Sequence, residues 1–248
     1  NSAAILQQGK IGQRFHKSLL PTYDVFDEAR YFEPASAVAP FPFQGRVLGI
    51  TICEDIWNDE DFWPERLYRR DPLKELIGLG ADLIINLSAS PWHTGKERTR
   101  LAMLQKVAAD ERLPLVHVNL VGANDELIFD GHSVALDGAG RLIALGKAFA
   151  EDLLLVDISQ ETPPLNPAWP VPEQQMFAAL SLGIRDYVRK CGFKSVVCGL
   201  SGGIDSALTA VLAVDALGAQ NVMGVAMPSK FSSEGSLRDA EALARNLG

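Results

Sequence analysis

The sequence predicts an α/β protein in two parts: a layered α/β domain, followed by part of a domain with a doubly wound parallel sheet. Two observations lead to this fold class. Before residue 160, strand-like and helix-like segments alternate. After residue 173, a helix is followed by a strand, a Ser/Gly-rich turn, a helix and a second strand. This order implies a right-handed crossover and a parallel sheet.

The first part covers residues 1–160. Apolar runs rich in β-branched residues predict strands at 47–52, 83–87 and 115–119. Helical patterns lie between them, at 72–80 and 96–112. Segments 131–136 and 141–145 flank a turn of Asp and Gly residues, which predicts a β-hairpin. Segment 152–158 predicts one more strand, so the domain combines parallel strands with antiparallel additions.

A proline-rich linker, residues 161–172, separates the two parts. Five prolines fall within residues 162–172. Proline lacks a backbone N–H and fixes φ, so such a stretch forms neither a helix interior nor a central strand.

The second part covers residues 173–248. It predicts a helix at 173–190 with Met176, Phe177, Leu180, Ile184 and Val188 on its apolar face. A last helix is opened by Ser232 or Ser233 and ended by Gly248. Only two strands of a doubly wound sheet are present, and the chain opens on Asn1 within a strand-like segment. We therefore expect a fragment or a processed product.

Composition excludes several classes of function. A formal net charge of −8 argues against nucleic acid as a partner, because phosphate backbones require a basic surface. No apolar run is long enough for a membrane span, and no signal peptide opens the chain. The three cysteines follow no disulfide pattern, which predicts free thiols in a reducing compartment and a cytoplasmic location. Cys191 and Cys198 are expected to be core or structural residues.

The most informative motif is Ser201-Gly-Gly-Ile-Asp-Ser206, between an apolar strand and an amphipathic helix. Gly202 and Gly203 allow positive φ and close approach of an anion, and backbone N–H groups at a helix N-terminus attract phosphate. Asp205 would repel a phosphate unless a cation lay between them, and Mg²⁺ suits that position. The alternative is a Gly-rich helix cap without a ligand.

A second candidate site is Cys53, which ends the strand at 47–52. A thiol at this place is expected to be exposed at the edge of the sheet. Lys17 lies upstream, and a nearby ammonium group favours a thiolate and stabilises an oxyanion. A buried structural thiol is the alternative that the residues alone leave open.

The segments around both candidate sites resemble known families. SGGIDS resembles the pyrophosphate loop of the ATP pyrophosphatase superfamily. KSLLPTYDVFDEARYF, GITICEDIW and NLSASPWHTGK resemble the nitrilase-type glutaminase domain of the glutamine-dependent NAD⁺ synthetase family. DYVRKCGFKSVVCGLSGGIDSALTAVLAVDALGA and MPSKFSSEGSLRDA resemble the synthetase domain of that family. The resemblance implies the C-terminal part of a nitrilase-like αββα glutaminase domain at 1–160. It implies the N-terminal part of the synthetase domain at 173–248.

For the glutaminase domain, the resemblance implies that Cys53 is the nucleophile and that Lys17 holds the oxyanion together with the N–H of Glu54. Glu28 would be the supporting carboxylate that orients Lys17. The groups that would bind the α-amino and α-carboxyl groups of glutamine are Tyr23, Glu54, Ser90 and Lys96. The general-base glutamate of the family lies on an earlier strand, and residues 1–16 contain no Asp or Glu.

For the synthetase domain, the resemblance implies an ATP-binding loop with Asp205 as a Mg²⁺ ligand. The loop residues are Ser201, Gly202, Gly203, Ile204, Asp205 and Ser206. Segment 227–230, with Lys230, resembles the part of the family that approaches the adenosine.

The implied function is glutamine-dependent NAD⁺ synthesis. Glutamine would supply ammonia, and ATP would adenylate deamido-NAD⁺ before ammonia displaces AMP. The implied partners are glutamine, ATP and deamido-NAD⁺, with a homo-oligomeric assembly. Two alternatives stay open: a stand-alone nitrilase-type amidase, and a catalytically incomplete fragment or assembly module. The 248-residue polypeptide alone is expected to be inactive, because it lacks the base.

Overall fold

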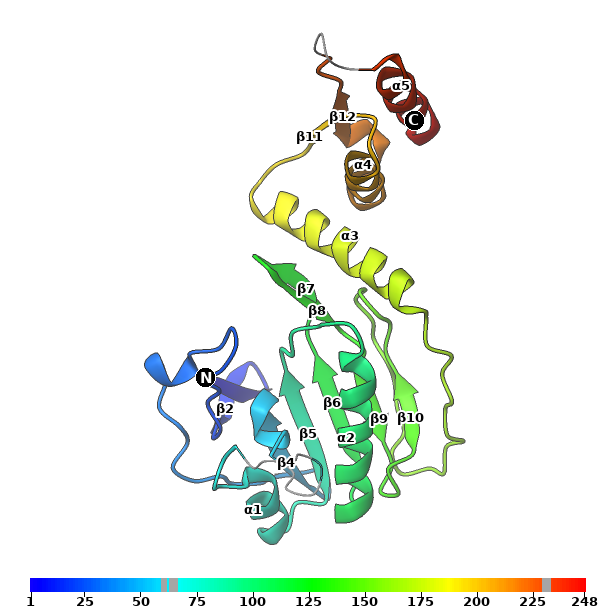
Figure 1. The fold of residues 1–248 in the computed structure, drawn as a ribbon. Helices are drawn as coiled ribbons and strands as arrows, with labels where there is room; N and C mark the ends of the chain where they lie inside the picture. The colour runs from blue at the N-terminus through cyan, green and yellow to red at the C-terminus, as the bar shows by residue number, and fades with distance from the viewer. Residues whose placement is uncertain (59–61, 63–66, 229–232) are drawn as a thin grey trace. The chain divides into compact units, whose positions relative to one another are not determined.

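The structure is a computed structural model that describes residues 1–58, 62, 67–228 and 233–248 (Figure 1). The chain forms two compact units. Unit 1 comprises residues 1–121 and 129–168, and unit 2 comprises residues 122–128 and 169–248. The chain therefore passes between the units after residues 121, 128 and 168. The mixed α/β class predicted from the sequence is confirmed in both units.

A mixed sheet forms the centre of unit 1. Its described strands follow the order β10 (Leu142–Leu145), β9 (Val134–Leu136), β6 (Leu115–Asn119), β5 (Leu83–Ser88), β4 (Arg46–Ile52) and β3 (Phe41–Phe43). β4, β5 and β6 are parallel, whereas β3, β9 and β10 pair antiparallel. The carboxyl ends of β4, β5 and β6 therefore meet at one edge, where Figure 1 shows the arrowheads of β5 and β6.

Helices α1 (Pro72–Gly78) and α2 (Lys96–Glu111) supply part of the main core of unit 1. α2 lies alongside β6 in Figure 1. Leu76, Leu104 and Leu136 are almost fully buried in this core. Gly49 allows the close packing, since a Cβ there would lie 2.8 Å from Cδ1 of Ile84. The core thus anchors the strand that leads to Cys53.

A second core cluster involves the hairpin of β1 (Ser2–Gln7) and β2 (Lys10–His16). Phe15 of β2 packs with Leu48, Ile50 and Leu83. This packing places the end of β2, and therefore Lys17, beside β4. Two short 3₁₀ helices follow in the sequence: η1 (Glu28–Arg30) and η2 (Cys53–Ile56).

Strands β7 (Val121–Asn124) and β8 (Leu127–Asp130) form a separate two-stranded hairpin. Its residues 122–128 belong to unit 2 because they pack on α3 (Pro172–Lys190). The Ala123 N–H donates a hydrogen bond of 2.8 Å to the Asp186 carboxylate, and the Lys190 ammonium donates to the Ala123 carbonyl. Residues 122–128, which precede the linker in the sequence, therefore belong to unit 2.

The strand predicted at 152–158 is wrong. The structure assigns no strand there, and Leu153 and Leu155 are 86% and 96% exposed. A strand requires a neighbour that satisfies its backbone hydrogen bonds, and none of the described strands pairs with this segment. The proline-rich segment forms no regular element until α3 begins at Pro172.

Unit 2 contains, after α3, β11 (Val196–Gly199), α4 (Ile204–Leu217), η3 (Ala219–Asn221), β12 (Val222–Val225) and α5 (Glu234–Leu247). β11 and β12 pair in parallel, as the crossover pattern predicts. Ser233 caps α5 by accepting the N–H of Ser236 at 3.1 Å. None of the described helices is long and apolar enough to cross a membrane.

The apolar face predicted for α3 is partly wrong. Met176 and Leu180 are 41% and 49% exposed, and the buried residues include Gln175, Ala179 and Leu182. Within unit 2, α3 packs against α4 and residues 122–128, and these neighbours determine which of its side chains are buried. All three cysteines are free, as predicted. Cys191 is nevertheless exposed and Cys198 half-buried, so the expected core position is wrong for Cys191.

Candidate functional site

Cys53 lies at a sharp turn immediately after β4, where η2 begins. Its φ of +46° is uncommon for a residue other than glycine, and such strained positions gather at functional sites. The thiol is half-buried rather than exposed, which corrects the sequence expectation. Ser88 Oγ lies 3.4 Å from Cys53 Sγ, and the Asn86 amide donates to the Cys53 carbonyl at 3.4 Å. Neighbouring β5 thus supports the turn that presents the thiol.

Asp55 joins the segment of Lys17 to the turn of Cys53. Its carboxylate is buried, and one oxygen accepts the N–H groups of Ser18 and Leu19 at 2.9 and 2.8 Å. The other oxygen accepts the Ile52 N–H at 3.1 Å. Burial raises the pKa of Asp55, although these three hydrogen bonds oppose that effect. One side chain therefore fixes the two backbone segments that carry Lys17 and Cys53.

Lys17 and Glu28 form an ion pair beside the thiol. Lys17 Nζ lies 2.6 Å from Glu28 Oε1, and the lysine side chain is only 1% exposed. Both residues and Cys53 line a pocket of about 410 Å³, together with Ser88. The structure thus brings together the predicted nucleophile, the predicted oxyanion holder and its supporting carboxylate.

The structure also brings Tyr23 to Glu54, the residue that follows Cys53 in the sequence. The Tyr23 hydroxyl donates a hydrogen bond of 2.7 Å to Glu54 Oε1. The Tyr68 hydroxyl donates to the same oxygen at 3.1 Å. Tyr68 was missed from the sequence, because nothing in the pattern around residue 68 indicates a partner fourteen residues earlier.

Ser90 is held by its backbone rather than by its hydroxyl. Its N–H donates to Asn119 Oδ1 at 3.0 Å, and the Asn119 amide donates to Asp130 Oδ1 at 3.1 Å. Asp130 in turn forms a buried ion pair of 2.6 Å with Arg100. The loop that carries Ser90 is therefore fixed by a chain of polar contacts from β6, β8 and α2.

Lys96 opens α2, and its ammonium lies 5.0 Å from the centre of the Trp57 ring, a cation–π contact. Burial lowers the pKa of Lys96 and the charge of Arg100 adds to that effect, whereas Cys53 and Glu54 oppose it. Tyr23, Glu54, Ser90 and Lys96 are not among the residues that line the Cys53 pocket. The predicted glutamine-binding residues therefore surround the turn rather than sharing that one pocket.

His117 lies beneath the site and is fully buried. Its Nδ1 is 2.8 Å from Asn86 Oδ1, and the Asn86 amide donates to Thr51 Oγ1 at 2.9 Å. Burial, with the charge of Arg100, lowers the pKa of His117 to about 3. The imidazole is therefore neutral near pH 7 and serves to orient Asn86.

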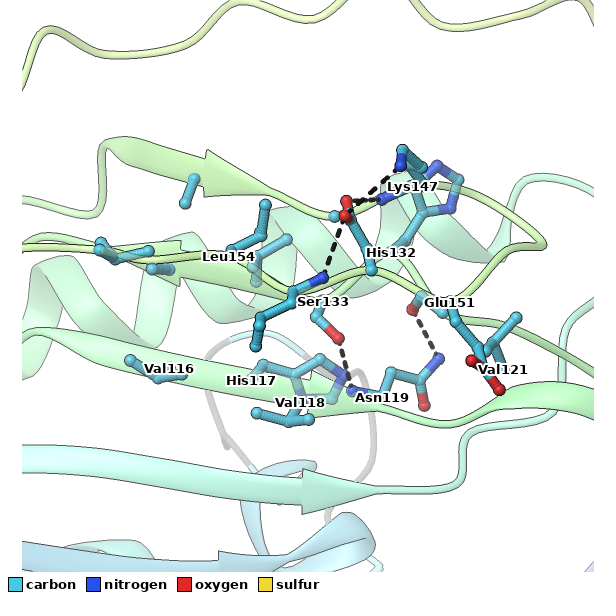
Figure 2. A pocket seen from close by; sticks show the side chains of 18 of the residues that line it. Val116, His117, Val118, Asn119, Val121, His132, Ser133, Lys147, Glu151 and Leu154 are labelled. Carbon is cyan, nitrogen blue, oxygen red and sulfur yellow. Dashed lines mark hydrogen bonds and ion pairs between the residues drawn. The ribbon is translucent and has the colours of Figure 1, made fainter.

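A further pocket, of about 450 Å³, lies elsewhere in unit 1 and does not contain Cys53 (Figure 2). Aliphatic side chains such as Val116, Val118 and Leu154 form much of its lining. At its polar end, the Asn119 N–H donates to Ser133 Oγ at 3.0 Å. Because this pocket holds neither the thiol nor its partners, the Cys53 pocket is the better candidate for catalysis.

The second predicted site is the loop 201–206, which ends at the N-terminus of α4. Ser201 Oγ and Ser206 Oγ lie 3.0 Å apart, and the Gly203 N–H donates to Ser201 Oγ at 3.2 Å. Ile204 is 79% exposed, and Asp205 is exposed in the first turn of the helix. The loop therefore presents hydroxyls and a helix N-terminus to solvent, an arrangement that suits a phosphate.

Only one of the two loop glycines requires positive φ. Gly202 has a φ of +81°, and a Cβ there would lie 2.3 Å from the Ser236 carbonyl oxygen of α5. Gly203 is the N-cap of α4 with a φ of −92°, so it does not use the positive φ that glycine allows. Extended N-cap geometry explains the difference, since the residue before a helix usually adopts the β-region.

Asp205 fits a Mg²⁺ ion only if phosphate oxygens supply its other ligands. Its carboxylate makes no hydrogen bond or ion pair within the described part of the chain. In that same part, no group of three or more His, Cys, Asp or Glu side chains could hold a metal by itself. Mg²⁺ commonly binds one or two carboxylates plus substrate phosphates, so this donor set is adequate. Ser229 and Lys230 of the predicted adenosine segment lie outside the described residues.

Comparison with known proteins identifies the family of this chain. The carbon-nitrogen hydrolase family model matches residues 1–163, and the NAD synthase family model matches residues 176–248. The chain belongs to the carbon-nitrogen hydrolase family, whose match includes Cys53, Lys17 and Glu28. Its relatives are glutamine-dependent NAD⁺ synthetases, as the resemblance in the sequence implies.

The protein of this name from Synechocystis sp. is 48% identical over all of this chain, which covers 45% of that relative. The one from Thermotoga maritima is 40% identical, with 48% of its length covered. A solved Acinetobacter baumannii glutamine-dependent NAD⁺ synthetase, in complex with ADP, superimposes with a TM-score of 0.85 at 37% identity. It covers all of this chain, which spans 46% of that structure. The chain thus spans about half the length of these relatives.

Proposed function

We propose that this chain carries the glutaminase nucleophile and the pyrophosphate loop of a glutamine-dependent NAD⁺ synthetase. The observation that carries the proposal is the pocket shared by Cys53, Lys17 and Glu28. The two family matches support it, and so does the presence of the loop 201–206, which suits a phosphate, in the same chain. A stand-alone amidase would not need the loop 201–206, so we favour the two-site enzyme.

At the first site, Cys53 Sγ attacks the side-chain amide carbon of glutamine. Lys17 and the Glu54 N–H stabilise the resulting oxyanion, and Glu28 keeps the ammonium of Lys17 in place. The thiol proton passes to the amide nitrogen, so that ammonia leaves when the C–N bond breaks, which gives a thioester on Cys53. Water then cleaves the thioester and releases glutamate. In sum, glutamine and water yield glutamate and ammonia.

Substrate recognition is assigned to the groups around the turn. Glu54, held by Tyr23, accepts the α-ammonium group of glutamine, whereas Ser90 and Lys96 bind the α-carboxylate. Opposite charges on Glu54 and Lys96 complement a zwitterionic amino acid. Removal of either charge would leave one end of the substrate without a charged partner.

At the second site, residues 201–206 cradle the phosphates of ATP. The loop hydroxyls and N–H groups bind phosphate oxygens at the N-terminus of α4. Mg²⁺, held by Asp205, would neutralise phosphate charge when bound. The nicotinate carboxylate of deamido-NAD⁺ attacks ATP, releases pyrophosphate and forms an acyl adenylate. Ammonia then displaces AMP and gives NAD⁺. The homo-oligomeric state and cytoplasmic location stay predictions.

Product analysis of the full-length protein tests this proposal. With glutamine, ATP, Mg²⁺ and deamido-NAD⁺ together, we expect NAD⁺, glutamate, AMP and pyrophosphate in equal amounts. Replacing glutamine by ammonium chloride should retain NAD⁺ and abolish glutamate. A protein that releases glutamate from glutamine but forms NAD⁺ with neither nitrogen donor would instead be a stand-alone amidase.

A further inference from the structure

One oxygen of the Glu54 carboxylate accepts hydrogen bonds from two tyrosine hydroxyls. Tyr23 and Tyr68 both hydrogen-bond to Oε1, at 2.7 and 3.1 Å. Glu54 is 6% exposed, and no described residue hydrogen-bonds to its second oxygen. One carboxylate oxygen is thus saturated by hydroxyls, while the other keeps its lone pairs.

Both tyrosines act as donors at any working pH. Burial raises the pKa of Tyr68 well above its ordinary value, and the Glu54 carboxylate raises it further. The pKa of Tyr23 is raised by the same two causes. Each phenol therefore stays protonated and donates a hydrogen bond to Glu54. Since both phenols donate to Oε1, the remaining oxygen of Glu54 suits a cation that donates a hydrogen bond.

The position of Tyr68 is fixed by a buried side chain next to the Cys53 turn. The Asn58 amide donates to the carbonyls of Tyr68 and Arg70, at 3.0 and 2.8 Å. The Tyr68 N–H donates back to Asn58 Oδ1 at 3.3 Å. Asn58 follows η2 closely and is 5% exposed. The segment of Tyr68 is therefore tied to the same turn that carries Cys53 and Glu54.

We propose that Tyr68 determines specificity for an amino-acid amide. Together with Tyr23, it orients Glu54 so that the free oxygen accepts the α-ammonium group of the substrate. Tyr68 is a positioning residue that acts through Glu54 and does not touch the reacting amide. This inference rests on the proposed glutaminase function, and it adds a residue that no sequence pattern indicated.

Ligand binding to the full-length protein with Cys53→Ala tests the role of Tyr68 without catalysis. The two ligands are glutamine and glutaramate, which lacks only the α-amino group. We expect Tyr68→Phe to weaken glutamine binding about tenfold, a typical effect for one hydrogen bond to a charged group. Glutaramate binding should change less than about twofold on the same scale. Tyr31→Phe is the matched control, since Tyr31 is 73% exposed, and it should alter neither ligand.

A double-mutant cycle shows whether Tyr68 acts through Glu54. In a Glu54→Gln background, Tyr68→Phe should change glutamine binding less than about twofold, because the charged partner is gone. Equal weakening of glutamine and glutaramate by Tyr68→Phe would overturn the inference, and so would unchanged glutamine binding. Failure of the proposed function is distinguishable, because it appears as absent glutamine hydrolysis with Cys53 intact, whatever the binding ratio.

Discussion

The Lys17 ammonium and the Glu28 carboxylate form a 2.6 Å ion pair in which the lysine is 1% exposed. A buried cation must be compensated, and Glu28 is its ion-pair partner among the described residues. The pair therefore holds a positive charge at the pocket of Cys53 in a fixed place.

Replacing Glu28 by Gln should affect both stability and glutamine hydrolysis. Breaking a buried ion pair on one side leaves a buried charge, which costs about 3–5 kcal/mol. We expect a lower free energy of unfolding and glutamine-driven NAD⁺ formation reduced by at least about a hundredfold. Ammonia-driven synthesis should be retained, as the second site is untouched.

Asp27→Asn provides the control for Glu28. The Asp27–Arg30 pair is 3.7 Å long, with side chains 60% and 70% exposed, so its loss should change stability by less than about 1 kcal/mol. Chemical denaturation and steady-state rates of both variants would check this. Equal effects of the two substitutions would show that the Lys17 pair has no special role.

The fully buried His117 predicts a loss of stability toward acid. Its pKa is about 3 in the folded protein against an ordinary 6.5. Between these two pKa values, His117 is protonated in the unfolded chain and neutral in the folded chain. The free energy of unfolding therefore falls as the pH decreases through this window. From pH 7 to pH 5 the contribution is about 2 kcal/mol.

His117→Gln should remove this part of the pH dependence. Denaturant unfolding at pH 7 and pH 5 measures the difference between wild type and variant. His93→Gln is the control, because His93 is exposed, and it should keep the wild-type pH dependence. An unchanged slope in His117→Gln would mean that His117 does not titrate as its burial implies.

Asp205→Asn should impair NAD⁺ synthesis with either nitrogen donor. Loss of the carboxylate weakens Mg²⁺ binding at the phosphates, and we expect a fall of at least about a hundredfold in adenylation. Glutamine hydrolysis at Cys53 should fall much less. Pyrophosphate release measures the first effect and glutamate release the second.

Asp215→Asn serves as the control for Asp205, because Asp215 is exposed on the same helix away from its N-terminus. It should leave both rates unchanged. Normal ammonia-driven turnover of Asp205→Asn would mean that the loop has only a structural role.

Sequence patterns predicted the parallel strands, the strand end at Cys53 and the loop before α4, because their signals are local. The strand end at Cys53 follows from an apolar run, and the loop 201–206 follows from glycines before a helix. The pairing of Lys17 with Glu28 was implied by the family resemblance of this segment, and the structure places the two side chains 2.6 Å apart. Each of these needs only a short stretch of chain.

Features that depend on distant packing were not predicted. Tyr68 meets Glu54 only because Asn58 fixes its backbone, and no periodicity encodes that contact. The stripe of α3 that is buried depends on which neighbours pack on it, so Met176 was assigned to the wrong face. Segment 152–158 has strand composition, yet a strand also requires a paired neighbour.

Cys53→Ala in the full-length protein shows whether the thiol is the nucleophile. The thiol serves only to release ammonia from glutamine, so we expect glutamine-driven NAD⁺ formation below about a thousandth of wild type, a loss of at least about 4 kcal/mol in transition-state stabilisation. Ammonia-driven synthesis should stay within about twofold of wild type. Cys191→Ala, at an exposed free thiol, should behave as wild type with both donors. Glutamine-driven turnover of Cys53→Ala within about tenfold of wild type would mean that Cys53 is not the nucleophile.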